Sequence, residues 1–137
     1  MARYKISEIE GIGPAYAEKL IAAGVKTVNA LLEKGCTRKG RKELAETTSL
    51  NESVILKWVN MADLFRVKGI GGEYSELLEK AGVDTVKELR KRNAENLHEK
   101  MVQVNSEGRG LVRQLPALSV VKRWIKAAEE LEPKVSY

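Results

Sequence analysis

Two short glycine motifs are the residues of this chain with the clearest capacity for chemistry. Gly11-Ile12-Gly13 and Gly69-Ile70-Gly71 each place two glycines around one aliphatic residue, between an apolar stretch and an expected helix. Glycine lets the backbone turn tightly, and the amides at the start of a helix have no acceptor within that helix. Such a turn points free N–H groups outward, where they can bind a phosphate.

The two motifs belong to an internal duplication. The offset between equivalent residues is 58 from the motif through the next helix, as for Ile12 and Ile70 or Thr27 and Thr85. Trp58 and Trp124 are 66 residues apart, so the second copy has gained eight residues. The insertion is expected between residues 93 and 113, where residues 105–110 are typical of a flexible linker. We therefore predict two repeats, residues 1–62 and 63–137.

The apolar pattern predicts an all-α chain. The apolar positions Tyr16, Ala17, Leu20 and Ile21 follow helical spacing and predict a helix over residues 15–23, which Gly24 ends. Thr27 and Thr85 are expected to cap the next helices, with Glu88 completing a capping box in the second copy. A further helix over residues 52–64 would carry Trp58 on its apolar side, and both tryptophans are expected in the core.

Composition limits the class of protein. The 137 residues are 43% hydrophobic and 31% charged, which suits one ordinary core or two small ones. No apolar run approaches the roughly 20 residues that span a bilayer, and no signal-peptide core follows residues 1–5, so we expect a cytoplasmic protein without a membrane partner. The single Cys36 excludes an intrachain disulfide and a cysteine-rich metal site, and fits a reducing compartment.

Residues 9–28 closely resemble the helix-hairpin-helix motif of DNA polymerase beta, of recombinase N-terminal domains and of other DNA repair proteins. The glycines, Ala17 and the turn over residues 23–25 are all in place. Residues 43–58 are similar to a second, decayed hairpin in which Ser49 replaces the usual glycine. The tandem arrangement resembles a bacterial family of tandem helix-hairpin-helix proteins of unknown function. The resemblance implies two small helical bundles, each a double helix-hairpin-helix unit with a decayed second hairpin.

The resemblance also implies a set of DNA-binding residues, because amides after the hairpin glycines contact DNA phosphates in that family without reading sequence. Pro14 has no N–H, and Lys19 would add a charge one turn later. Lys68 would support phosphate binding in the second copy. Glu73 in the second copy and Glu10 in the first copy both put a carboxylate where a phosphate should approach. The amide donors would be those of Gly11, Gly13, Ala15 and Tyr16 in the first copy and Gly69, Gly71, Glu73 and Tyr74 in the second.

The basic residues give a second, weaker indication. The chain has a net charge of +5, which suits nucleic-acid binding and is also common in proteins that bind none. Arg38, Lys39, Arg41 and Lys42 form a secondary basic patch, and residues 90–92 are a smaller cationic cluster. Each could follow a phosphate backbone, or could be the solvated end of a helix.

Nothing in the sequence favours catalysis. His98 has no nucleophile or paired carboxylate in a recognisable arrangement, and Asp84 lies in a turn where a role in helix entry explains it. No metal-ligand spacing occurs, and no Walker-type lysine follows either glycine motif. We therefore expect no catalytic residue, no metal and no cofactor.

Two functions from different classes remain open. The first is a non-enzymatic module that binds the phosphates of duplex or branched DNA without sequence specificity. The second is a protein-interaction or self-association module that uses the same helical scaffold. A helix-turn-helix reading of Ala45, Ser49, Leu50, Ile55 and Trp58 is weaker, because Ser49 stands where glycine is usual and the outward side chains include few that read bases.

Overall fold

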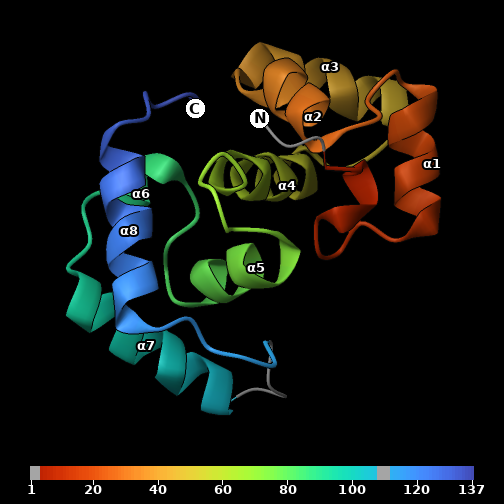
Figure 1. The fold of residues 1–137 in the computed structure, drawn as a ribbon. Helices are drawn as coiled ribbons and strands as arrows, with labels where there is room; N and C mark the ends of the chain where they lie inside the picture. Colours follow the sequence, from red (N-terminus) through yellow and green to blue (C-terminus); the bar gives the residue numbers. More distant parts are fainter. Residues whose placement is uncertain (1–3, 108–111) are drawn as a thin grey trace. The chain divides into compact units, whose positions relative to one another are not determined.

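The computed structural model describes residues 4–107 and 112–137, and these residues form helices connected by turns (Figure 1). The β-type pairing among them is one isolated antiparallel bridge between Lys5 and Thr27. The prediction of an all-α chain is confirmed. Among the described residues, no helix combines the length and the apolar character needed to cross a bilayer.

The chain divides into two compact units. Unit 1 contains Met1–Asp63 together with Lys134–Tyr137, and unit 2 contains Leu64–Pro133. The sequence repeat placed the boundary after residue 62. The return of the last four residues to unit 1 was not anticipated, since this segment has no counterpart in the first copy.

Unit 1 begins with a short 3-10 helix, η1, and continues with four α-helices. η1 spans Ile6–Glu8, α1 Pro14–Ala22, α2 Val28–Gly35, α3 Arg38–Thr48 and α4 Glu52–Leu64, the last ending one residue beyond the boundary. Ile9, Leu20, Leu31 and Trp58 are among the apolar side chains buried in this unit.

Unit 2 repeats the order of the four α-helices, and all but the first differ in length from their counterparts. It contains α5 (Gly72–Lys80), α6 (Val86–Leu89), α7 (Ala94–Glu107) and α8 (Leu118–Glu129). Helix α8 packs against α6 and α7, and α7 also packs against α5 (Figure 1). Trp124 lies in the resulting apolar core, as the sequence predicted.

The predicted helix ends are largely confirmed. Gly24 and Gly82 follow α1 and α5 with φ values of 89° and 94°, the left-handed conformation that favours glycine after a helix. Thr27 and Thr85 accept hydrogen bonds from the third residues of α2 and α6. The reciprocal half of the predicted capping box is absent, because the Glu88 carboxylate accepts a hydrogen bond of 2.9 Å from Arg92 instead.

The linker prediction for residues 105–110 is wrong for its first three residues, which belong to α7. Val104 packs against the core of unit 2, and the Asn105 side chain accepts a hydrogen bond of 3.1 Å from the Val112 amide. These two contacts extend the helix into a polar stretch that composition alone marks as a loop. Residues 108–110 lie outside the described part of the chain.

Ser49 has a left-handed backbone conformation. It follows α3 with φ 60° and ψ 29°, and it is the single residue other than glycine with a positive φ in the described chain. The turn between α3 and α4 therefore places a residue other than glycine in the left-handed region, which residues with a side chain rarely adopt.

Two glycines allow α2 to pack closely against its neighbours, Gly40 at the contact with α3 and Gly35 at the contact with α4, and the sequence did not predict this role. A methyl group at Gly40 would lie 1.8 Å from the carbonyl oxygen of Lys34, and one at Gly35 would lie 2.4 Å from Cγ2 of Val59. The Lys34 carbonyl oxygen that faces Gly40 is a backbone atom, so it cannot rotate away as a side chain can. Any larger residue there has to push the two helices apart.

We predict that Gly40→Ala lowers the free energy of unfolding by at least about 2 kcal/mol, because overpacking against backbone has no cheap relief. Urea denaturation followed by circular dichroism measures the effect. The neighbouring exposed Lys39→Ala serves as control and should change stability by less than about 0.5 kcal/mol. Equal stability of the two variants would show that α2 and α3 do not need this close contact.

Candidate nucleic-acid interface

The first glycine turn spans residues 9–13 and connects η1 to α1. The Ile12 amide donates a hydrogen bond of 3.1 Å to the Ile9 carbonyl, which closes the turn. Gly11 has φ 94°, the positive value that the third residue of a type II turn requires. Among the hydrogen bonds of the described residues, none is donated by the amides of Gly11 or Gly13.

The second glycine turn, residues 67–71, has the same geometry. The Ile70 amide donates to the Val67 carbonyl at 3.1 Å, and Gly69 has φ 95°. A turn that recurs with the same closing hydrogen bond and the same dihedral angle is a property of the repeated sequence, not of one local environment.

Each turn leads into the first turn of a helix. The first backbone hydrogen bond of α1 runs from the Ala17 amide to the Gly13 carbonyl at 2.9 Å, and the matching bond of α5 runs from Ser75 to Gly71 at 2.9 Å. The amides of Ala15 and Tyr16 precede that bond, so neither has an acceptor within the helix.

The second copy has one donor more than predicted. Glu73 and Tyr74 occupy the positions of Ala15 and Tyr16, and their amides likewise precede the first helical bond. Gly72 stands where the first copy has Pro14, and it carries an N–H that proline lacks. The sequence analysis overlooked Gly72, although the alignment of the two copies contains the signal.

The two turns differ in how open they are. In the first, Gly13, Ala15, Tyr16 and Lys19 are all exposed. In the second, Lys68 and Glu73 are exposed, whereas Gly71 and Tyr74 are only partly so. The Tyr74 hydroxyl donates a hydrogen bond of 3.0 Å to the Gln114 carbonyl, and the position equivalent to Lys19 is the buried Leu77.

A tryptophan lies directly behind each turn. A methyl group at Gly11 would be 3.7 Å from Nε1 of Trp58, and one at Gly69 would be 3.2 Å from Nε1 of Trp124. Both tryptophans also contact the tyrosine at the start of the helix, with ring centroids 5.2 Å apart in each copy. Core positions were predicted for these tryptophans, but their part in supporting the turns was not.

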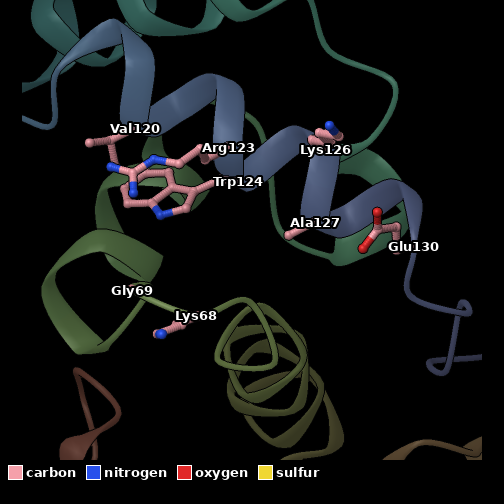
Figure 2. Close-up of a pocket in the computed structure, with 8 residues that line it drawn as sticks. All are labelled: Lys68, Gly69, Val120, Arg123, Trp124, Lys126, Ala127 and Glu130. Carbon is pink, nitrogen blue, oxygen red and sulfur yellow. The ribbon is translucent and has the colours of Figure 1, made fainter.

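The second turn borders a pocket of about 490 Å³ within unit 2 (Figure 2). Lys68 and Gly69 line one side, and one face of α8 lines the other. Three cations and one carboxylate are among the lining residues, so the surroundings of this turn are positive despite Glu73. The lining residues are Lys68, Gly69, Val120, Arg123, Trp124, Lys126, Ala127 and Glu130.

The secondary basic patch is smaller than the sequence indicated. Arg38, Lys39 and Lys42 are exposed on α3, but Arg41 is only 4% exposed. Its guanidinium donates to the Gly35 carbonyl at 2.9 Å and to the Ser136 carbonyl at 2.6 Å. Arg41 therefore fastens the last residues of the chain to unit 1 and cannot join its neighbours on a phosphate backbone.

A carboxylate also lies within this patch. Glu43 forms an ion pair of 2.7 Å with Lys34, and the hydrogen bond and charge of Lys34, with a smaller effect of Lys39, lower the pKa of Glu43 below its usual value. The carboxylate therefore stays ionised at neutral pH and offsets part of the positive charge of α3.

The smaller cationic cluster, residues 90–92, is partly engaged. Arg92 donates to the Gly82 carbonyl at 2.8 Å and pairs with Glu88 at 2.9 Å. With Lys91 and Lys100 it lines a second hollow of about 330 Å³.

His98 and Cys36 are held by ordinary contacts. Nε2 of His98 is 3.0 Å from the Pro116 carbonyl oxygen, and Sγ of Cys36 is 3.5 Å from the Glu33 carbonyl oxygen. Within the described residues, no three of His, Cys, Asp and Glu gather in a way that could hold a metal ion.

A comparison with protein-family models matches residues 10–131 to a domain of unknown function, DUF4332. The match covers the glycines of both turns and both tryptophans. No curated protein and no solved structure matches the chain.

We predict that the two glycines of one turn respond differently to alanine. Gly69→Ala should lower the free energy of unfolding by about 1–2 kcal/mol, because it forces a side chain into the left-handed region and against Trp124. Gly71→Ala should cost less than about 1 kcal/mol, since nothing lies within 4 Å of a methyl group there and only capping preference is lost. Urea denaturation of both variants tests this order, and a reversed order would contradict it.

Proposed function

The chain belongs to the DUF4332 family, a domain of unknown function, and we propose that it is a non-enzymatic module that binds DNA phosphates through its two glycine turns. The observation that carries the proposal is that one chain builds the same turn twice. Each turn leads into a helix of nine residues whose first-turn amides have no acceptor within that helix.

The chemistry of the turns suits a phosphate. Amides at a helix N-terminus carry partial positive charge, and they donate hydrogen bonds in a fixed direction. Gly13 has no side chain and nothing within 4 Å of the place where one would begin, so an anion can approach the backbone closely. Lys19 lies one helical turn away on the exposed side of α1 and adds a full charge.

This arrangement would bind DNA without reading its sequence. Backbone amides contact phosphate oxygens, which are the same at every base pair, whereas sequence is read by side chains at the base edges. The prediction of non-specific binding therefore follows from the use of main-chain donors.

The two turns are expected to contribute unequally. The first is more exposed and has Lys19, but Glu10 lies within the turn itself. The second has Lys68 at the position of Glu10 and an additional donor at Gly72, but Glu73 follows in the first turn of α5. A carboxylate repels the negatively charged phosphate, so each copy combines favourable donors with one unfavourable side chain.

The alternative is a protein-interaction or self-association module, and the salt dependence of binding separates it from DNA binding. Phosphate binding by cations weakens steeply between about 50 and 200 mM salt, because condensed counterions are released from DNA. We expect such a slope in fluorescence anisotropy titrations against duplex and branched DNA. A failure to bind either DNA even at 50 mM salt would favour the alternative.

The mechanism is tested by placing threonine at both helix starts, Gly13→Thr with Gly71→Thr. Threonine is a good N-cap residue, so its hydroxyl should occupy a first-turn amide while its methyl group fills the space for a phosphate. We expect helix stability to be kept or raised and DNA affinity to fall at least about tenfold, the effect of losing about 1.4 kcal/mol. Anisotropy titration and urea denaturation measure the two quantities.

Ala117→Thr is the matched control. Ala117 is the N-cap of α8, its side chain makes no capping hydrogen bond, and it lies outside both turns. The same substitution there should leave DNA affinity unchanged. Unchanged DNA affinity in the folded double variant would refute binding through the turns.

A further inference from the structure

The phosphate contacts proposed for the second turn do not use the pocket beside it. Its volume of about 490 Å³ lies in the range of small-molecule sites, and a single phosphate at the turn does not fill it. Val120, Trp124 and Ala127 follow one another at spacings of four and three residues, so they share one face of α8. That face gives the pocket an apolar wall (Figure 2).

The first copy has a larger residue at one of the lining positions. With the offset of 66 that relates the tryptophans, Ala127 corresponds to Met61, which is 1% exposed. A methionine side chain fills space that the single methyl group of alanine leaves empty. The second copy therefore has a small, partly exposed side chain where the first has a long, buried one.

The charges at the pocket have changed as well. Lys68 stands where the first copy has Glu10, and Lys126 stands where it has Asn60. Arg123 corresponds to Lys57, so this cation is common to both copies. The second copy thus combines an apolar wall with a positive border, and Glu130 is the one carboxylate in the lining. An apolar wall beside cations fits an organic anion with a flat apolar body.

We propose that this pocket receives one unstacked nucleotide, with its base against Val120, Trp124 and Ala127 and its phosphate near Lys68 and Arg123. The inference rests on the proposed function and extends it. Lys68 and Gly69 belong to both the pocket and the second turn, so a strand held at the turn has its next nucleotide beside the pocket. The module would then prefer DNA with unpaired bases, because unstacking a paired base costs free energy. A free mononucleotide shares this chemistry.

The test is Ala127→Met, which places the methionine of the first copy at this position of the second. Anisotropy is measured with a fully paired duplex and with an oligothymidylate of equal length. We expect affinity for the oligothymidylate to fall about five- to tenfold, in line with the loss of one base contact, while duplex affinity stays within about twofold. Methionine is a good helix former, so α8 should persist.

Two further variants keep the test decisive. Val102→Met places the same side chain on the exposed surface of α7, away from the pocket lining, and should change neither affinity. Arg123→Gln removes a charge at the edge of the pocket without filling space, and it should lower the affinity for the oligothymidylate more than the affinity for the duplex. If neither Ala127→Met nor Arg123→Gln alters oligothymidylate or mononucleotide binding, the pocket proposal is wrong.

The outcome separates the pocket from the turns. If the double threonine variant loses duplex binding and Ala127→Met changes the affinity for no ligand, the proposal for the turns stands and the pocket proposal is wrong. The reverse pattern would keep the pocket and reject the turns. Titration with dAMP, followed by tryptophan fluorescence, distinguishes the source of the nucleotide. Binding of dAMP that Ala127→Met abolishes, without any binding of DNA, would assign the pocket to free nucleotides.

Discussion

The fold of each repeat depends on a glycine held at positive φ in front of a tryptophan. Gly11 and Gly69 have nearly the same φ, and Nε1 of Trp58 or Trp124 lies behind the turn in each case. The glycine has no side chain, so the backbone of the turn can pass close to the indole ring. The start of the next helix is consequently presented at the surface, and every functional argument about this chain begins there.

The two copies share this constraint but differ in the residues around it. The turn, its closing hydrogen bond and the contact between tyrosine and tryptophan recur, yet Lys68 replaces Glu10, Gly72 replaces Pro14 and Ala127 replaces Met61. The glycines of the turns and the aromatic contact are the same in both copies, whereas several side chains around them differ in charge and size. The two copies thus offer similar main-chain donors in different electrostatic settings, and under the proposed function their phosphate contacts would differ in strength.

The sequence was sufficient where the signal is local. Gly24, Thr27 and Thr85 define helix ends through their own backbone or hydroxyl chemistry, and the helix over residues 52–64 was predicted with its bounds. It was insufficient where the partner is distant. Arg41 looks like part of a basic patch until Ser136, 95 residues later, accepts its hydrogen bond. Gly40 looks like a break in a cationic run until the backbone of α2 passes beside it.

The central claim is that the first-turn amides bind phosphate, and an NMR titration of ¹⁵N-labelled protein with a short DNA duplex tests it most directly. A new hydrogen bond to a phosphate oxygen shifts the resonance of the donating N–H. The account predicts that the largest shifts fall on the amides of Gly11, Gly13, Ala15 and Tyr16, and on those of Gly69, Gly71, Gly72, Glu73 and Tyr74. Shifts confined to other helix faces, such as the exposed side of α3, would contradict it.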